Sequence, residues 1–282
     1  MEFQMEKIGF IGLGAMGSKM APLLAQSGFE VYGFDINKIN SGKDYVIVEN
    51  LKGLHDTDVI IFMLPDGKIV NQVVRNLLEL GSKSIMIDMS SSDPNDTIEL
   101  GNYLTKRNIE FIDAPVSGGV SRAITGDLTI MVGGDKTTLE KVNGILDIMG
   151  NVKKAGPLGA GHAMKSLNNY VSAAGLIASF EALHTAKKYG INPLDFIEII
   201  NGATGKNNTT EVKLEKFVVS RKYNSGFALN LMIKDVSIAD QLIKIMSSDN
   251  PLSTNVLTYL KKSYEIIGDQ SDHTEVYKIL KK

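Results

Sequence analysis

The stretch IGFIGLGAMG, residues 8–17, decides the fold of the N-terminal half of the chain. A short apolar run typical of a buried β-strand leads into Gly12, Gly14 and Gly17, which have GxGxxG spacing. Such glycines permit a tight turn from strand to helix and let the backbone approach a pyrophosphate, which the helix N-terminus would bind. A glycine-rich turn without a ligand also fits this motif alone. The predicted cofactor-binding residues here are Gly12, Leu13, Gly14, Ala15, Met16 and Gly17.

The next predicted strand, EVYGFD, ends in Asp35, where dinucleotide-binding domains place a carboxylate for the adenosine ribose. A 2′-phosphate would be repelled by Asp35, and neither Ile36 nor Asn37 offers a compensating guanidinium. The pattern therefore favours NAD over NADP as cofactor. The alternative is that Asp35 only caps a turn.

From residue 7 to about 155, short β-rich runs alternate with amphipathic helical patterns. Strands that are apolar almost throughout, separated by helices, indicate a parallel sheet buried on both faces. We expect an α/β fold, with a Rossmann-type doubly wound domain over residues 1–161. Only helical patterns follow, starting with a long helix that ends at Gly190, so an all-α domain is expected over residues 162–282. Further helices are expected over 69–80, 94–107, 137–149, 192–200, 211–220, 229–246 and 251–267.

Composition excludes several classes of function. Thirty basic and 32 acidic residues give a formal net charge of −2 without a basic stripe, so nucleic acid is not an expected partner. No signal sequence is apparent and no apolar run approaches the roughly 20 residues that span a bilayer, so we expect no membrane partner and a cytoplasmic location. The chain has no cysteine, and its four histidines show no HExxH spacing, so we expect no metal site.

Two loops that follow strands carry further candidates, because ligands on parallel sheets bind beyond the carboxyl ends of the strands. In MLPDG, residues Met63, Leu64 and Pro65 form an apolar wall suited to one side of a cofactor. In DMSSSDP, hydroxyl groups occur at residues 90–92, although Asp93 or Ser92 also fits the cap of a helix that begins with Pro94.

A third loop, DAPVSGGV, offers the Ser117 hydroxyl and the unobstructed backbone N–H groups of Gly118 and Gly119. Such a group of donors suits a carboxylate, although an ordinary glycine turn fits the stretch equally well. The surroundings of Ser117 do not form a GxSxG elbow, so it is a poor candidate for a hydrolase nucleophile.

The start of the long helix, GAGHAMKSLNNYV at residues 159–171, carries polar residues where a packed helix would have aliphatic ones. At about 100° per residue, Lys165, Asn168, Asn169 and Ser172 fall on one stripe. A hydrated surface is the ordinary explanation. Because the helix follows the nucleotide domain directly, we expect it to line a cleft, where partial burial would lower the pKa of Lys165 towards neutrality. Such a lysine can exchange a proton with a substrate hydroxyl, which Asn169 would orient.

The segments FIGLGAMG, DAPVSGGV, GAGHAMKSLNNY and LMIKDVSIA occur in the order and spacing of the β-hydroxyacid dehydrogenase family, which the chain resembles from about residue 7 to 280. The resemblance implies NAD(P)-dependent oxidation of a CH–OH group in a small 3-hydroxy acid, such as 3-hydroxyisobutyrate, or the reverse reduction. It implies that Lys165 is catalytic. It implies substrate contacts for Ser117, Gly118, Gly119, Asn169 and Ser91, and cofactor contacts for Ser91, Phe227, Lys234 and Asp235.

The substituent on the substrate is not readable, but Arg122 and the loop GATGKNNTT at residues 202–210 are candidates for selecting it. We expect the helical domain to mediate a homodimer or homotetramer. The competing hypothesis is a non-catalytic dinucleotide-binding sensor or interaction protein. The polar stripe that contains Lys165 argues against a sensor, which has no use for a lysine in a cleft.

Overall fold

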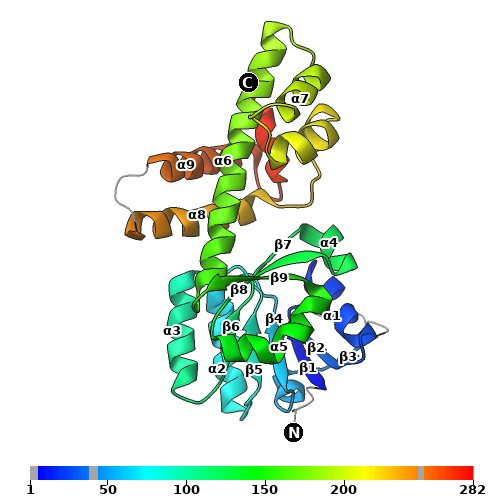
Figure 1. Cartoon of the computed structure of the whole chain (residues 1–282), viewed down its shortest axis with the longest axis vertical. Helices are drawn as coiled ribbons and strands as arrows, with labels where there is room; N and C mark the ends of the chain where they lie inside the picture. The colour runs from blue at the N-terminus through cyan, green and yellow to red at the C-terminus, as the bar shows by residue number, and fades with distance from the viewer. Residues whose placement is uncertain (1–5, 38–43, 247–250, 282) are drawn as a thin grey trace. The chain divides into compact units, whose positions relative to one another are not determined.

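The computed structural model describes residues 6–37, 44–246 and 251–281 (Figure 1). By its internal contacts the chain divides into two compact units, Met1–Lys165 and Ser166–Lys282. The boundary falls inside the helix α6 (Ala160–Tyr189), so the chain passes from one unit to the other without a loop. Within the described ranges, no helix is long and apolar enough to cross a membrane.

The first unit is built on one mixed sheet. Its strands are β1 (Lys7–Ile11), β2 (Glu30–Phe34), β3 (Val46–Ile47), β4 (Val59–Phe62), β5 (Ile85–Asp88), β6 (Phe111–Asp113), β7 (Val116–Ser117), β8 (Leu128–Gly133) and β9 (Gly150–Gly156). Their order is β3-β2-β1-β4-β5-β6-β8-β7, with β9 paired to β8. Pairing is parallel from β3 to β6, as the sequence predicts.

The sheet departs from the predicted parallel arrangement at β8, which runs antiparallel to β6 and β7 and parallel to β9. The stretch 118–127 between β7 and β8 is shorter than the roughly dozen residues that a parallel crossover needs. Most strand pairs of the sheet are therefore parallel. The apolar pattern of the strands does not reveal that β8 runs antiparallel to its neighbours β6 and β7.

Helices cover both faces of this sheet. They are α1 (Gly17–Gln26), the short 3₁₀ helix η1 (Leu51–Leu54), α2 (Gly67–Glu79), α3 (Pro94–Thr105), α4 (Gly119–Thr125) and α5 (Lys136–Met149). In the fully buried strand β4, Val59 and Ile61 join one core with α1 and α5, whereas Ile60 and Phe62 join another with α2 and α3. Because successive side chains point to opposite faces, the sheet lies between two helical layers (Figure 1). The Rossmann-type doubly wound fold is confirmed.

The second unit is helical. Besides most of α6 it contains α7 (Pro193–Asn201), the π-helical segment η2 (Thr209–Val219), α8 (Leu229–Met246), α9 (Pro251–Ile267) and the 3₁₀ segment η3 (His273–Lys281). A single core that includes Leu176, Phe180, Leu260 and Tyr277 holds these helices together. The bounds of α8 and α9 agree with the predicted ones. The π-helical winding of η2 was not predicted, because an amphipathic pattern indicates a helix but not the register of its hydrogen bonds.

Candidate active site

The three glycines of the turn between β1 and α1 meet different physical requirements. Gly12 has a φ of +94°, and a Cβ there would overlap the carbonyl oxygen of Met63. A Cβ on Gly17 would overlap the carbonyl oxygen of Gly12. Gly14 differs, because its φ lies outside the left-handed region and no described atom lies within 4 Å of its Cβ position. Packing explains the first and third glycines, and the open space beside Gly14 fits close approach of a pyrophosphate.

The N-terminus of α1 is suited to an anion. Met16 occupies the capping position, no side chain of the described residues caps the helix, and its first turn contains no acidic residue. The first N–H groups of a helix have no partner within it, and the helix dipole favours a negative charge beside them. Leu13 is buried. The backbone from Gly14 to Gly17 could hold a phosphate group, and its contact with a dinucleotide stays a prediction.

Asp35 ties the end of β2 to this turn. Its Oδ2 accepts a hydrogen bond from the Leu13 N–H at 2.8 Å, and its Oδ1 accepts one from the Asn37 N–H at 2.8 Å. Asp35 therefore does cap a turn, and it does so beside the glycine turn. The Asn37 side chain donates a third bond at 3.1 Å, and because a carboxylate offers about four lone-pair sites, acceptor capacity remains for a ribose hydroxyl.

The loops after β4 and β5 are joined to each other. The Leu64 N–H donates to Ser90 Oγ at 2.9 Å, while the Ser90 N–H and the Ser92 hydroxyl donate to the buried carboxylate of Asp88 at 2.9 and 2.8 Å. These two serines thus have structural partners. Ser91, the one predicted to contact a ligand, is half-buried between them.

The predicted apolar wall lies partly against the glycine turn. Met63 and Leu64 are half-buried, whereas Pro65 is exposed. The position that a Cβ on Gly12 would occupy is faced by the Leu64 side chain and, from Met63, by the backbone carbonyl only. The structure also places Asp93 as the cap of α3 and Pro94 as its first residue. The prediction that the stretch DMSSSDP provides a helix cap is therefore confirmed, with Asp93 as the cap.

The loop DAPVSGGV contains two adjacent glycines with positive φ, +141° at Gly118 and +69° at Gly119. Ser117 is the last residue of β7 and pairs with Thr129 of β8. Successive N–H groups in turn conformations of this kind form an anion-binding concavity, which agrees with the predicted carboxylate contact. Contact with a substrate stays a prediction.

The first residue of the same loop, Asp113, holds the start of α6. Its Oδ1 accepts a hydrogen bond from the Gly159 N–H at 2.7 Å and its Oδ2 accepts one from the His162 N–H at 2.8 Å. Burial raises the pKa of the Asp113 carboxyl, and the neighbouring His162 and the two N–H groups oppose that shift. A carboxylate at a helix N-terminus satisfies donors that the helix itself leaves without partners. Asp113 therefore fixes the turn of α6 that precedes Lys165.

The ring of His162 is buried among polar groups from three elements. Its Nδ1 lies 2.9 Å from the Thr97 hydroxyl on α3, and its Nε2 lies 3.2 Å from the carbonyl oxygen of Ser90. Carboxylate oxygens of Asp113 and Asp88 lie 3.6 and 3.7 Å from the ring nitrogens. The structural role of this histidine was not predicted, because its sequence spacing bears only on whether it could bind a metal. The available signal was that both aspartates end buried strands.

Lys165 is half-buried and is the last residue of the first unit. Four residues along α6, Asn169 is only 7 % exposed, and its amide donates to the carboxylate of Asp235 on α8. Asn168 donates to the Asn169 side-chain oxygen at 3.1 Å. Residues four apart share a helix face, so Lys165 and Asn169 lie on one stripe of α6. Asp235, predicted only as a cofactor contact, orients Asn169 in this structure.

The remaining predicted residues belong to the second unit. Phe227 and Lys234 are half-buried. The Phe227 ring packs edge-on against His273 with centroids 5.6 Å apart, and its carbonyl oxygen accepts the His273 N–H at 3.0 Å. Lys234 precedes Asp235 on α8. The predicted cofactor contacts of these residues stay predictions.

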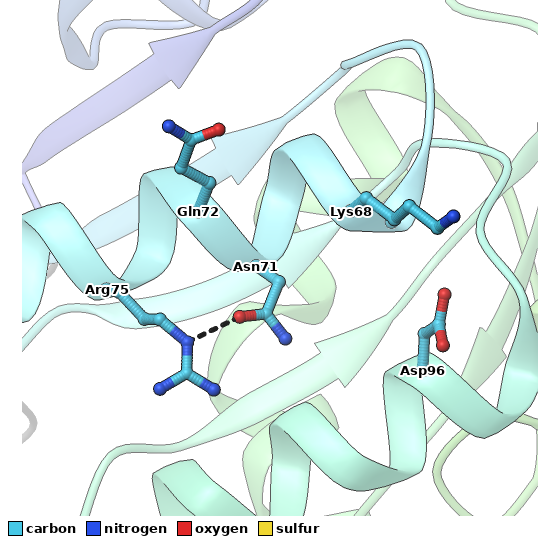
Figure 2. Close-up of a pocket in the computed structure, with 6 residues that line it drawn as sticks. Lys68, Asn71, Gln72, Arg75 and Asp96 are labelled. Carbon is cyan, nitrogen blue, oxygen red and sulfur yellow. Dashed lines mark hydrogen bonds between the residues drawn. The ribbon is translucent and has the colours of Figure 1, made fainter.

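A shallow pocket on the surface between α2 and α3 contains none of the predicted site residues (Figure 2). Its volume is about 320 Å³, and it is lined by Gly67, Lys68, Asn71, Gln72, Arg75 and Asp96. Arg75 donates to Asn71 Oδ1 at 2.6 Å and its guanidinium lies 4.3 Å from the centre of the Tyr103 ring. Charges of both signs line the pocket, and its arginine is already engaged, so we assign it no ligand.

Comparisons with known proteins cover nearly the whole chain. Residues 7–159 match the family model described as the NAD binding domain of 6-phosphogluconate dehydrogenase. Residues 159–280 match the family model described as NAD-binding of NADP-dependent 3-hydroxyisobutyrate dehydrogenase. The two matches meet at the start of α6.

Individual relatives agree with these matches. The chain is 36 % identical over 245 residues to 2-(hydroxymethyl)glutarate dehydrogenase of Eubacterium barkeri, covering 83 % of this chain and 81 % of that protein. It is 31 % identical over 284 residues to 2-hydroxy-3-oxopropionate reductase of Escherichia coli K12, covering 97 % of each. A solved structure of Mycobacterium tuberculosis 3-hydroxyisobutyrate dehydrogenase with L-serine has a TM-score of 0.91 at 29 % identity, covering 99 % of this chain and 100 % of that one.

Proposed function

The chain belongs to the β-hydroxyacid dehydrogenase family, and from this premise we propose that it interconverts a small 3-hydroxy acid and the corresponding aldehyde. Membership confirms the predicted class of enzyme, an NAD(P)-dependent dehydrogenase or reductase acting on a hydroxy acid. In this proposal residues 1–161 form the dinucleotide-binding domain, and residues 162–282 form the all-α domain.

The compounds named for the relatives support a common substrate core. 2-(Hydroxymethyl)glutarate, 3-hydroxyisobutyrate and L-serine each carry a hydroxymethyl group on the carbon next to a carboxylate. 2-Hydroxy-3-oxopropionate is an aldehyde of the same pattern. They differ in the substituent on that carbon, so the part of the site that binds the carboxylate and the reacting carbon would be shared.

The nucleotide-binding residues fit a nicotinamide dinucleotide, which supplies or takes up the hydride when it is bound. The open space beside Gly14 and the uncapped N-terminus of α1 would receive the pyrophosphate. Asp35 would accept hydrogen bonds from the adenosine ribose, and its negative charge would disfavour the 2′-phosphate of NADP. We therefore propose NAD as the preferred cofactor, with Met63, Leu64 and Pro65 along one side of it.

Lys165 would exchange the proton with the substrate. In the oxidation its neutral amine accepts the hydroxyl proton as the hydride leaves the same carbon, and in the reduction its ammonium group returns that proton. Asn169 would orient the reacting oxygen, and the backbone around Gly118 and Gly119, with the Ser117 hydroxyl, would hold the carboxylate. Further contacts to the cofactor or substrate are proposed for Ser91, Phe227, Lys234 and Asp235.

The observation that carries this proposal is the ordering of α6. Asp113 fixes its first turn, and Asp235 fixes Asn169, one turn beyond Lys165. A buried asparagine held by a buried carboxylate presents a defined group to a ligand, which a hydrated surface helix would not need.

Location and assembly form a further part of the proposal. We propose a cytoplasmic homodimer or homotetramer. Apolar side chains that the helical unit leaves exposed, among them Val171 and Ile199 at 67 % and 68 %, support contacts between copies of the chain. Light scattering on the purified protein would measure the number of copies, and a monomer at micromolar concentration would contradict this part.

A panel of 3-hydroxy acids tests the activity. The protein is incubated with NAD or NADP and with 3-hydroxyisobutyrate, L-serine, glycerate or 2-(hydroxymethyl)glutarate, and formation of reduced nicotinamide is followed by absorbance. We expect turnover of at least one compound, with the larger kcat/KM for NAD. Tight binding of NAD without turnover across the panel would contradict the proposal and favour a sensor.

A further inference from the structure

A second lysine lies against α6 within the helical unit. Lys213 comes from η2, and its Nζ lies 3.5 Å from the hydroxyl of Ser172 on α6. The Lys213 side chain is half-buried, and among the described residues no carboxylate lies within 4.0 Å of its ammonium group. An ammonium group has three donors, so a single distant hydroxyl leaves capacity for an anionic ligand.

Asp272, the acid whose charge acts on Lys213, is already engaged. The carboxylate of Asp272 accepts hydrogen bonds from the Ser225 hydroxyl at 2.9 Å, from the Gly226 N–H at 2.8 Å and from the Thr274 N–H at 2.9 Å. These bonds hold the carboxylate against the start of η3. Asp272 therefore stabilises the charge of Lys213 only from a distance, and the ammonium group has no carboxylate partner of its own.

Lys213, His273 and Asp272 form a cluster of titratable groups, in which Lys213 has the pKa nearest to neutral pH. Burial lowers the pKa of Lys213 to about 8, and the Asp272 carboxylate opposes that shift. Burial, followed by the charge of Lys213, lowers the pKa of His273 to about 4. Burial would raise the pKa of the Asp272 carboxyl, but the hydrogen bonds that it accepts hold this pKa below its usual range. At pH 7 the cluster thus contains a protonated lysine, a neutral histidine and an ionised aspartate.

The backbone that carries Lys213 is fixed to α6. Just before η2, Asn207 donates a side-chain hydrogen bond to the Ser179 hydroxyl on α6 at 3.0 Å, and its side-chain oxygen accepts the Thr209 N–H at 2.8 Å. η2 is π-helical, a rare winding that is frequently found at functional sites. Loop 202–210, a predicted selector of the substituent, thus leads directly into an anchored helix that presents a lysine.

Lys213 approaches the same stripe of α6 that carries the proposed catalytic residues. Ser172 follows Asn169 by three residues, which at 1.5 Å per residue places it about 4.5 Å further along the helix axis. Lys165, Asn169 and Ser172 share one face. Lys213 therefore lies about one helical turn beyond Asn169 along this face, in the direction in which the substituent of a substrate oriented by Asn169 would extend.

We propose that Lys213 is a specificity-determining residue that binds a second carboxylate of the substrate, so that the chain prefers a dicarboxylic 3-hydroxy acid over one with a methyl or amino substituent. This inference rests on the proposed function. A relative that is 36 % identical to this chain is named for 2-(hydroxymethyl)glutarate, a compound of this class.

The test compares two substrates in three proteins. Values of kcat/KM are measured for 2-(hydroxymethyl)glutarate and for 3-hydroxyisobutyrate with the wild type, Lys213→Met and Lys216→Met. Lys216 is an exposed lysine on the same helix and serves as the matched control. We expect Lys213→Met to lower kcat/KM for the dicarboxylate about 10²-fold, mainly through KM, because loss of a desolvated ion pair weakens binding by that order. The value for 3-hydroxyisobutyrate should stay within about threefold, and Lys216→Met should change neither.

The pH dependence gives a second readout. The ratio of kcat/KM for the dicarboxylate to kcat/KM for 3-hydroxyisobutyrate cancels titrations that both substrates share. Since Lys213 must be protonated to bind a carboxylate, this ratio should fall as the pH rises through about 8 in the wild type and should be flat in Lys213→Met. Two charged or titratable groups of the described residues face Lys213, namely Asp272 and His273. Both titrate far below pH 8.

The outcomes separate this inference from the proposed function. A wild type that prefers 3-hydroxyisobutyrate, or a Lys213→Met variant that slows both substrates equally, overturns the role of Lys213 and leaves the dehydrogenase activity standing. Turnover of no 3-hydroxy acid in the panel, despite NAD binding, overturns both.

Discussion

The carboxylate of Asp113 at the end of β6 accepts a 2.8 Å hydrogen bond from the backbone N–H of His162, and so joins the sheet to the first turn of α6. In Asp113→Asn, the single amide oxygen can serve only one of the two N–H groups, and the other would be left buried without an acceptor. We expect the free energy of unfolding, measured by urea titration, to fall by about 1–3 kcal/mol. We also expect kcat to fall about tenfold, because Lys165 lies on the next turn.

Asp135→Asn is the control for that variant. Asp135 caps α5 through the N–H groups of Thr137 and Thr138, and it is unrelated to α6. Asparagine caps a helix about as well as aspartate does, so this variant should leave both stability and kcat nearly unchanged. Equal kcat values for wild type and Asp113→Asn would show that the bond stabilises the fold without positioning the lysine.

Two glycine variants separate cofactor binding from folding. Gly14→Ala adds a methyl group where no described atom lies within 4 Å, so the melting temperature should change little while the Kd for NADH rises at least about tenfold. Gly17→Ala would overlap the Gly12 carbonyl oxygen, so it should lower stability itself. Calorimetric titration measures the Kd for NADH, and thermal melts measure the stability of each variant. Unchanged NADH affinity in Gly14→Ala would place the pyrophosphate elsewhere.

Asp35→Asn tests the choice of cofactor. The substitution removes the negative charge, while its side-chain oxygen can still accept the Leu13 N–H. We expect the ratio of kcat/KM for NAD to that for NADP to fall by about 10- to 100-fold, since the 2′-phosphate is no longer repelled. A wild type that already prefers NADP would contradict the role given to Asp35.

His273 makes the helical unit sensitive to acid. Burial lowers its pKa from 6.5 to about 4, so between these values the unfolded chain binds a proton that the folded chain does not. The stability present above pH 6.5 is therefore lost progressively as the pH falls towards 4. Urea titrations at several pH values should show a smaller decline for His273→Gln than for the wild type. An equal decline of the free energy of unfolding with falling pH in wild type and His273→Gln would contradict the role given to His273.

Features encoded locally could be predicted from the sequence. The glycine turn, Asp35 and the bounds of α8 and α9 depend on neighbouring residues and on helical periodicity, and the family resemblance was carried by four such segments. Hydrogen bonds between segments distant in the sequence could not be predicted. Asp113 meets His162 49 residues away, and Asn169 meets Asp235 66 residues away, through side chains that converge only on folding.

Lys213 illustrates the same limit. In the sequence it is one of many lysines on amphipathic helices, where a hydrated surface is the normal expectation. Its half-buried position beside Ser172 depends on the anchoring of η2 by Asn207, which no local pattern shows. The antiparallel pairing of β8 was missed for another reason, because β8 is buried almost throughout and its apolar run is the one expected of a parallel strand.

The central claim is that Lys165 exchanges the substrate proton, and the most direct measurement is the single-turnover rate of hydride transfer in Lys165→Ala. Lys188→Ala, an exposed lysine on the same helix, is the control. We predict that the rate falls about 10²-fold or more in Lys165→Ala while the Kd for NADH stays within about twofold, and that the control matches the wild type. A Lys165→Ala enzyme that binds NADH and retains the wild-type rate would contradict the account.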